Sequence, residues 1–236
     1  MNLQAALVDV GGTLWPERNW ASPATLTAKR AVRLQAAGLD SGAIDALLPE
    51  LWAWTQSGDE LEYLDVWAMI EDACAGALVH GFSPDAVRHA MYLPAAGNLE
   101  PLPSAGALLE CIRDLDLRCV IASNGVYRAE AEYWDDFHAQ GLAHLIHSVV
   151  SSVDTRWRKP NPRFFEAALD AAGAPARACV MIGNSEAKDI VPAATLGMRT
   201  VRVAIEEPMP AVSVADTVCE SLQEAATALR QLVRRT

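Results

Sequence analysis

Three short apolar runs, each ending in small or polar residues, constrain the fold of this chain more than any other feature. Residues 3–8 end at Asp9, residues 118–122 (RCVIA) end at Ser123, and residues 179–182 (CVMI) end at Gly183 and Asn184. Near-continuous apolar runs of this length are typical of strands buried on both faces of a parallel sheet. A loop and then a helical pattern follow each run. The sequence therefore predicts an α/β fold with a doubly wound, Rossmann-like parallel sheet.

The rest of the chain extends this pattern and interrupts it once. Further strands are expected at 147–150, 200–203 and 216–219, and helices at 104–115, 129–140, 162–172, 188–196 and 222–233. Residues 15–98 contain helical patterns alone, at 23–37, 41–55, 61–79 and 84–93. We therefore expect an α/β core of residues 1–14 and 99–236, with an inserted all-helical cap of residues 15–98 seated over the strand ends.

The carboxyl ends of the expected strands define where chemistry should occur. In open α/β sheets, ligands bind in the crevice outside these ends. Asp9, Ser123 and Asn184 each follow a predicted strand directly, although they lie far apart in the sequence. The strand pattern therefore predicts that these three side chains converge on one site.

Charge and composition exclude several classes of protein. The net charge of −11 argues against a nucleic-acid or anionic-membrane partner, because both require a basic surface. The sequence has no run of eighteen apolar residues, so no transmembrane helix is expected, and the N-terminus lacks the basic region of a signal peptide. The five cysteines form no CxxC pair. We interpret them as reduced thiols in a cytoplasmic protein.

The residues at the strand ends carry groups suited to a displacement reaction. Asp9 can act as a nucleophile, and Gly11 and Gly12 allow backbone amides to approach an anion closely. Ser123 can donate to a negatively charged oxygen, and Lys159 in the segment RKPNP can neutralise an anion. Together these groups favour displacement at a phosphoryl group or at an activated carbon.

These segments resemble the four ordered motifs of the haloacid dehalogenase-like (HAD) hydrolase superfamily, in its helical-cap branch. The first motif is LVDVGGTL, the second VIASNG, the third RKPNPRFFEAAL and the fourth VMIGNSEAKDIVPAATLGM. The resemblance covers about the whole chain, and residues 15–98 correspond to the cap that this superfamily inserts after the first motif. Each motif alone is weak, but four in the right order at suitable spacing are specific.

The resemblance implies a role for each matching residue. It implies that Asp9 and Lys159 are catalytic. It implies that substrate or phosphate is bound by Gly12, Thr13, Ser123, Asn124 and Lys159. The implied magnesium ligands are Asp9, Gly11 (through its carbonyl), Asn184 and Asp189. Asp189 holds a metal, orients Lys159 or caps the following helix, while Asn124 contacts substrate or fixes its loop. The implied cofactor is Mg²⁺. The implied partner is a small anionic substrate, with the chain acting as a monomer or a homodimer.

Two positions depart from the pattern of phosphatases in this superfamily. Gly11 stands where such enzymes usually carry a second aspartate, which protonates the leaving alcohol and then activates water. Glycine cannot transfer a proton, and general acid–base help contributes about 10²- to 10⁴-fold in rate. Asn184 replaces the first acid of the fourth motif, and an amide supplies no charge, so magnesium should bind more weakly.

These departures leave three hypotheses open. The first is a phosphatase-type hydrolase acting on a small phosphorylated metabolite through Asp9. The second is metal-independent hydrolysis of a carbon–halogen bond, as in the 2-haloacid dehalogenases, which also lack the second aspartate. The third is a degenerate domain that binds a ligand or a protein partner without turnover.

Overall fold

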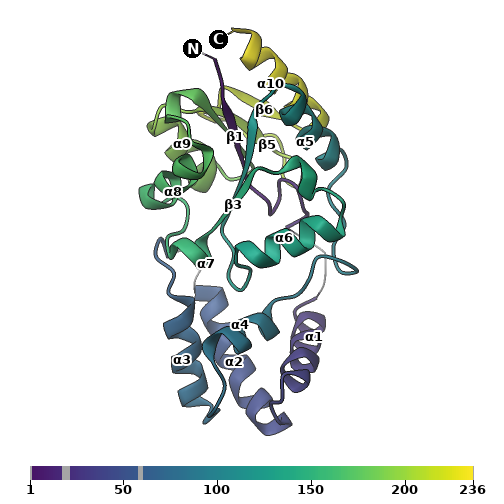
Figure 1. The fold of residues 1–236 in the computed structure, drawn as a ribbon, viewed down its shortest axis with the longest axis vertical. Coiled ribbons are helices and arrows are strands. Elements are labelled where there is room, and N and C mark those ends of the chain that lie inside the picture. The colour runs from purple at the N-terminus through teal and green to yellow at the C-terminus, as the bar shows by residue number, and fades with distance from the viewer. Residues whose placement is uncertain (1, 18–21, 58–60, 236) are drawn as a thin grey trace.

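The computed structural model contains a six-stranded sheet in which every neighbouring pair of strands is parallel (Figure 1). The structure describes residues 2–17, 22–57 and 61–235. The strand order is β3-β2-β1-β4-β5-β6, so β2 and β3 lie on one side of β1, and β4, β5 and β6 lie on the other. The predicted doubly wound α/β fold is confirmed.

The strands and helices alternate after residue 100 as the sequence predicts. The strands are β1 (Ala5–Val8), β2 (Arg118–Ser123), β3 (Ser148–Ser151), β4 (Cys179–Gly183), β5 (Arg199–Val203) and β6 (Thr217–Cys219). The α-helices of this part are α5 (Ala105–Asp114), α6 (Glu130–Ala139), α7 (Ser152–Thr155), α8 (Pro162–Ala172), α9 (Val191–Thr195) and α10 (Leu222–Arg235). Two short 3₁₀-helices, η2 (Ala143–Leu145) and η3 (Ala176–Ala178), and a π-helical turn, η4 (Glu186–Ile190), complete it.

Helices bury both faces of the sheet, which explains why its central strands β1, β2 and β4 are largely apolar. On one face, α5, α6 and α10 pack over side chains such as Val8, Ile121 and Ile182. On the other face, α8 covers Leu7 and Met181 with an apolar stripe. Only the carboxyl ends of the strands are left for polar residues, and these ends face the helices of the expected cap (Figure 1).

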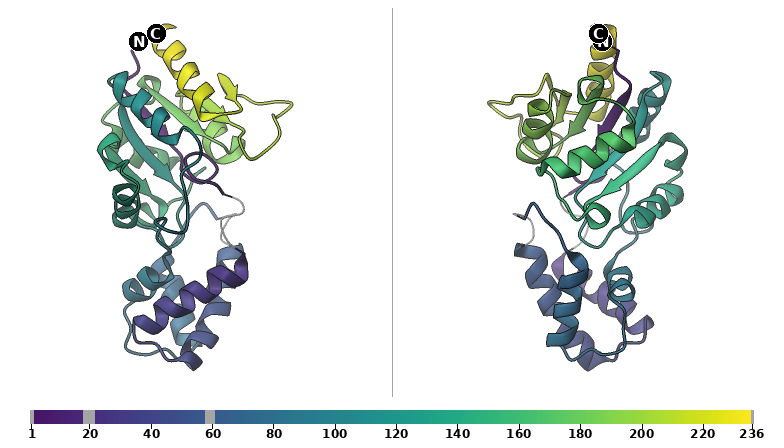
Figure 2. Two further views of the ribbon diagram at one scale, coloured as in Figure 1. Left: turned by 90° about the vertical axis from the view of Figure 1, so that its right-hand side faces the viewer. Right: turned by 60° about the vertical axis from the view of Figure 1, so that its left-hand side comes forward.

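Four helices between β1 and β2 form a group of their own below the sheet, as the further views also show (Figure 2). They are α1 (Pro23–Ala36), α2 (Ser41–Ser57), α3 (Val66–Gly76) and α4 (Pro84–Met91). Their shared core includes Leu34, Leu47, Leu51 and Ile70, each fully buried. Serine side chains cap α1 and α4, and a proline follows each cap at the first helical position, which favours helix initiation there.

One expected helix is shorter than predicted. The pattern over 61–79 gives helix only from Val66, because Asp65 caps it by accepting a hydrogen bond from the main-chain N–H of Ala68. The preceding residues pair instead with the segment 156–158: Leu64 N donates to Arg156 O at 2.7 Å. The local sequence pattern could not predict this pairing, because the partner segment lies some ninety positions later in the chain.

A buried ion pair joins α4 to α6. The Arg88 guanidinium donates to both carboxylate oxygens of Glu132 at 2.7 Å, and both side chains are less than a tenth exposed. Burial alone would raise the pKa of Glu132, but hydrogen bonds from Arg88, His89 and the Ala129 N–H lower it to about 2. A two-pronged contact of this kind fixes α4 against α6 in both distance and orientation.

Removing the charge of Glu132 should weaken the contact between α4 and α6. We expect Glu132→Gln to lower the free energy of unfolding by about 1.5–3 kcal/mol at neutral pH, the range for a hydrogen bond to a charged group. Because the pKa is lowered on folding, the ionised group stabilises the native state above its ordinary pKa of 4.5. The difference in the free energy of unfolding between wild type and variant should therefore shrink as pH falls from 4.5 to about 2. Urea titrations across this range measure it, with the exposed Asp135→Asn on the same helix as control; a pH-independent difference would contradict the assignment.

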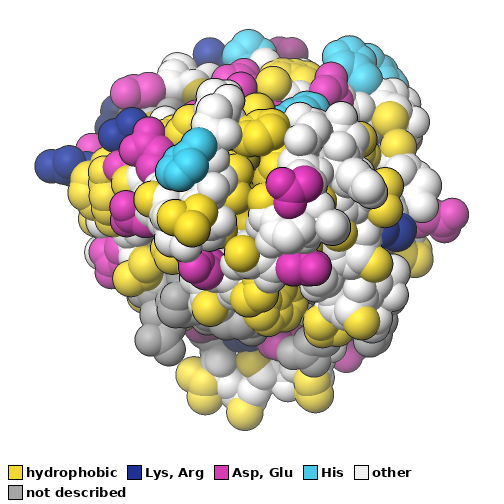
Figure 3. Space-filling view, turned by 90° about the horizontal axis from the view of Figure 1, so that it is seen from below, with side chains coloured by type: hydrophobic (Ala, Val, Ile, Leu, Met, Phe, Trp, Pro, Cys, Tyr) yellow, Lys and Arg dark blue, Asp and Glu magenta, His cyan; other side chains and the backbone are white. Residues whose placement is uncertain are grey.

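The far end of the helical group carries a mixed surface. Figure 3 shows acidic side chains spread there among apolar ones, with dark-blue cations toward the edge of the view. Within the described ranges, no helix combines the length and apolar character that a membrane crossing needs.

Candidate active site

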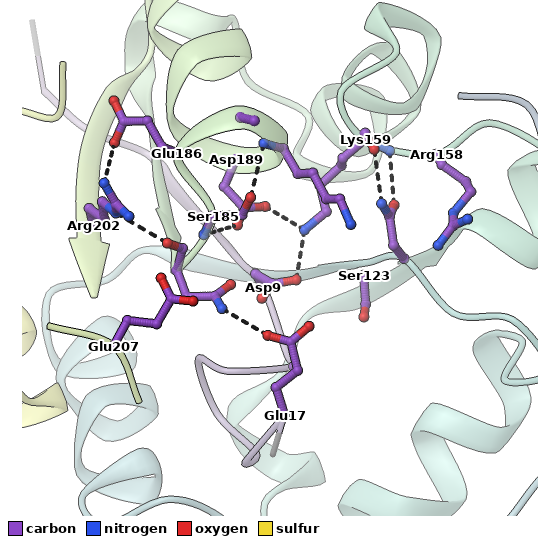
Figure 4. A pocket seen from close by; sticks show the side chains of 15 residues that line it. Asp9, Glu17, Ser123, Arg158, Lys159, Ser185, Glu186, Asp189, Arg202 and Glu207 are labelled. Carbon is purple, nitrogen blue, oxygen red and sulfur yellow. Dashed lines mark hydrogen bonds and ion pairs between the residues drawn. The ribbon is translucent and has the colours of Figure 1, made fainter. Parts of the chain in front are cut away.

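Asp9 lies at the bottom of a polar cavity just beyond β1, with 6% of its surface exposed (Figure 4). Its two carboxylate oxygens have different partners. Lys159 Nζ donates to Oδ1 at 2.7 Å, and the hydroxyl of Thr13 donates to Oδ2 at 2.9 Å. These bonds fix the carboxylate, and each oxygen retains a lone pair that can attack an electrophile.

Lys159 lies between two buried carboxylates. Its ammonium donates to Asp189 Oδ1 at 2.6 Å as well as to Asp9. Burial alone would lower the pKa of Lys159, but the charges of Asp189 and Asp9 outweigh this and raise it. Burial raises the pKa of Asp189, and the charge of Lys159 opposes that rise. The two carboxylates therefore keep the Lys159 side chain positively charged beside Asp9, the candidate nucleophile.

The end of β2 supplies a hydroxyl, and the loop after it positions Lys159. Asn124 bonds the backbone of Lys159 twice, accepting from its N–H at 2.8 Å and donating to its carbonyl at 2.9 Å. These bonds fix the loop, and Asn124 also lines the cavity, so contact with substrate stays a prediction. Tyr133 donates to Ser123 Oγ at 2.7 Å, which leaves the serine proton for another acceptor. Ser123 lines the cavity and can donate to an anion there.

The two glycines after β1 have different environments. Gly12 has a φ of +71°, and a Cβ there would come within 2.2 Å of the amide nitrogen of Asn184, so this position requires glycine. Gly11 lines the cavity, and a Cβ added to it would meet nothing within 4 Å. Space for a side chain thus exists at the position where the resemblance leads one to expect a second aspartate in a phosphatase.

The structure places most, but not all, of the expected site residues around the cavity. Asp9, Gly11, Ser123, Asn124, Lys159, Asn184 and Asp189 line a volume of about 390 Å³. Gly12 and Thr13 lie behind this lining. Thr13 is fully buried against Asp9, so its contact is with the nucleophile.

The donors expected for magnesium are otherwise engaged. All four carboxylate oxygens of Asp9 and Asp189 accept a hydrogen bond: Lys159 reaches one oxygen of each, Thr13 reaches Asp9 Oδ2, and the Ser185 N–H reaches Asp189 Oδ2 at 3.0 Å. Among the described residues, no group of three or more His, Cys, Asp or Glu side chains could hold a metal ion. The Lys159 ammonium lies between the two carboxylates, so a divalent ion that bridged them would have to displace it.

Asn184 contacts Glu17 through its side chain and Arg202 through its main chain. Its Nδ2 donates to Glu17 Oε2 at 3.2 Å, and its main-chain carbonyl oxygen accepts from Arg202 Nε at 3.2 Å. The Gly11 carbonyl and Asn184 therefore remain magnesium ligands by resemblance alone. The reaction steps derived below do not pass through a metal.

Three polar residues that line the cavity or bond to its lining have no signal in the motifs. Glu17 reaches it from the segment after Trp15, and Tyr133 reaches Ser123 from α6; neither sequence context predicts this contact. The sequence could have indicated a role for Arg202, because an arginine near the end of a buried strand (RTVRV) is unusual. It is 9% exposed and pairs with Glu186 at 2.9 Å.

Trp15, in the segment that leads toward α1, is 2% exposed and belongs to the core. Its indole N–H donates to Gln140, and its ring stacks on Phe137 with centroids 5.0 Å apart. It also borders a second cavity that continues from the first.

Comparison with known proteins agrees with this geometry. The family model described as haloacid dehalogenase-like hydrolase matches residues 3–197. The chain belongs to this family. Among relatives of this HAD-like hydrolase, a glyceraldehyde 3-phosphate phosphatase from Methanothermobacter thermautotrophicus is 32% identical over 46% of each chain. A phosphoserine phosphatase from Thermus thermophilus is 34% identical over 43% of this chain and 39% of its own length. The match thus spans less than half the length of these curated relatives.

Solved structures share the fold of this HAD-like hydrolase over nearly its full length. A HAD phosphatase from Thermococcus onnurineus aligns with a TM-score of 0.64 at 19% identity, covering 96% of this chain and 98% of that one. A 2-haloacid dehalogenase from Pseudomonas syringae aligns with a TM-score of 0.67 at 18% identity, covering 98% and 99%. At these identities the likeness concerns the fold and does not distinguish the two reactions.

Proposed function

We propose that this chain hydrolyses small organic phosphate monoesters through a phosphoryl intermediate on Asp9. One observation carries the proposal: the Asp9 carboxylate lies in a cavity with the Lys159 ammonium 2.7 Å away and the Ser123 hydroxyl in the same lining. A nucleophile beside a fixed cation and a hydroxyl donor suits attack on a phosphoryl group. The phosphatases among its relatives support the same bond type, since the names of those proteins specify small phosphorylated molecules.

The proposed reaction has two steps. An oxygen of Asp9 attacks phosphorus, the P–O bond to the alcohol breaks, and the alcohol takes a proton from solvent. Water then attacks the phosphorus of the aspartyl-phosphate, which releases inorganic phosphate, regenerates the Asp9 carboxylate and returns a proton to solvent. Lys159 and Ser123 offset the charge that builds on the phosphoryl oxygens in both steps. Gly11 contributes no proton, so esters with acidic alcohols should react fastest.

The magnesium expected from the resemblance stays a prediction. A structure of the putative HAD hydrolase YfnB from Bacillus subtilis is described as bound to magnesium, at 17% identity to this chain. Here the charge of Lys159 occupies the space between Asp9 and Asp189. The assays below are therefore run both with magnesium and with EDTA.

Turnover and trapping together test the proposed function. The purified chain is incubated with aryl and alkyl phosphates, and phosphate release is followed. Rapid acid quenching and peptide mass spectrometry then locate the phosphoryl group. We expect turnover of aryl phosphates and a phosphorylated Asp9 peptide. Absence of phosphate release from every ester, with either magnesium or EDTA, would overturn the proposal.

Carbon–halogen hydrolysis is the second candidate, and Gly11 favours it. A halide leaves without a proton, so a site lacking an acid at position 11 loses nothing in the step that expels it. Attack of Asp9 on the carbon bearing the halogen would give an ester intermediate and free halide. Water would then hydrolyse the ester, which releases the hydroxy acid, regenerates the Asp9 carboxylate and returns a proton to solvent. Halide release from 2-chloropropionate in EDTA, with no release of phosphate from the esters, would replace the first candidate with this one.

A further inference from the structure

A second cavity of about 470 Å³ continues from the nucleophile's cavity toward α1, α2 and the end of α4. The two share Gly11, Glu17, Ser123 and Asn124 in their linings. Beyond this shared wall the character changes from charged to apolar and aromatic, with Trp15, Trp52, Met91, Tyr92 and Tyr133 in the lining. A molecule that reacts at Asp9 can therefore extend its other end into this more apolar cavity.

Two arginines line this second cavity, and the charge of one of them is already paired with a carboxylate. Arg128 donates to Asp136 at 2.8 Å and to the Leu93 carbonyl at 2.9 Å. Its guanidinium lies 5.1 Å from the centroid of Tyr92 and 5.3 Å from that of Tyr133. These contacts account for its charge and its position, so Arg128 acts as part of the wall.

Arg30, from α1, is different. Its Nε donates to the main-chain carbonyl of Met91 at 3.1 Å, and its guanidinium lies 5.4 Å from the ring centroid of Tyr127. It is partly buried, and this burial lowers its pKa. The contacts recorded for Arg30 among the described residues include no carboxylate, in contrast to Arg88 and Arg128. A partly desolvated cation with neutral partners is a ready site for an incoming anion.

We propose that the second cavity binds the non-reacting end of the substrate, and that Arg30 pairs there with a carboxylate remote from the phosphate. This inference rests on the proposed function, since it names the substrate class: an aromatic phosphate monoester that carries a carboxylate at its far end. The aromatic lining suits a flat apolar body, and the guanidinium fork suits a carboxylate. Arg30 thus sets specificity, while Asp9 and Lys159 act on the phosphate.

A pair of substrates tests the assignment. Phenyl phosphate and 4-carboxyphenyl phosphate differ by the remote carboxylate, and the ratio of their kcat/KM values measures its contribution. We expect wild type to prefer the carboxylated ester and Arg30→Gln to reduce that preference by about 10- to 100-fold, as expected for a charge-assisted hydrogen bond. Arg33→Gln is the matched control. Arg33 lies one turn further along α1, bonds the carbonyls of Ala90 and His89, and does not line the cavity, so its ratio should stay at the wild-type value.

A binding measurement separates this inference from the proposed function. Calorimetry compares phenylphosphonate with 4-carboxyphenylphosphonate, which cannot be hydrolysed, on wild type and Arg30→Gln, after melting curves show that the variant is folded. Tighter binding of the carboxylated probe that depends on Arg30 supports the inference even if no ester is turned over. Equal preference in wild type and Arg30→Gln overturns it, and the proposed function stands if both esters are hydrolysed.

Discussion

Replacing Asp9 with asparagine is expected to lower kcat for aryl phosphates on the order of 10⁴-fold or more, because the variant cannot form the acyl-phosphate intermediate. The substitution preserves shape. The asparagine carbonyl can still accept from Lys159, and its amide can donate to the hydroxyl of Thr13, so the contacts at 2.7 and 2.9 Å have replacements. Lys159 also keeps its bond to Asp189. The loss should therefore appear in chemistry, with little change in melting temperature.

Steady-state kinetics and mass spectrometry measure this loss together. The Asp9→Asn protein should show neither turnover nor a phosphorylated peptide, while Asp114→Asn, an exposed aspartate on α5 that pairs with Arg113, should behave as wild type. If Asp9→Asn kept activity within about tenfold of wild type, phosphate would be released by a route that does not use this carboxylate, because loss of a covalent nucleophile costs far more than that.

The fold could be predicted because its signals are local and repeated. The strand Ala5–Val8 and its two counterparts are buried on both faces, and this burial leaves a near-continuous apolar pattern that indicates a central parallel strand. The same pattern marks where each strand ends. Ser123 and Asn184 lie around one cavity with Asp9 because neighbouring parallel strands end at the same edge.

Other contacts could not be predicted because they depend on how distant segments meet. Glu17 reaches the cavity through its bond to Asn184, 167 positions away. The pairing of Leu64 with Arg156 replaced a helical turn that local periodicity favoured. Arg30 has the sequence context of an ordinary helical arginine, and only the packing of α1 beside Met91 and Tyr127 gives it a cavity to line. Such contacts are set by tertiary geometry, which a single sequence does not encode in its local pattern.

Replacing Gly11 with aspartate is expected to raise kcat for alkyl phosphates by about 10²- to 10⁴-fold, the range that general acid–base catalysis contributes. Three features of the site permit the gain. Gly11 lines the cavity beside Asp9, a Cβ there meets nothing within 4 Å, and its φ lies outside the left-handed range. The backbone can therefore accept the side chain without strain. The neighbouring Gly12 cannot, because its φ is +71° and Asn184 lies against it.

Gly11→Asn is the matched control, because asparagine has the size of aspartate but cannot transfer a proton. The gain should also depend on the leaving group. Alkyl alcohols are weak acids and need protonation as the P–O bond breaks, whereas an acidic phenol leaves without help. Aspartate at position 11 should thus accelerate alkyl esters far more than aryl esters. A similar effect of aspartate and asparagine would show that shape or hydration, and not proton transfer, limits the reaction.

The same variant separates the three hypotheses for the natural chain. If wild type is inert and Gly11→Asp turns over phosphate esters, then Asp9, Lys159 and Ser123 already form a working site that lacks only its acid. If wild type hydrolyses aryl esters and the variant extends this to alkyl esters, the natural enzyme is a phosphatase restricted to acidic leaving groups. If wild type releases halide and the variant does not improve that rate, the absence of an acid at Gly11 matches a reaction whose leaving group never needs a proton. Each outcome follows from the leaving group, because a Cβ at position 11 meets nothing within 4 Å and glycine itself cannot transfer a proton.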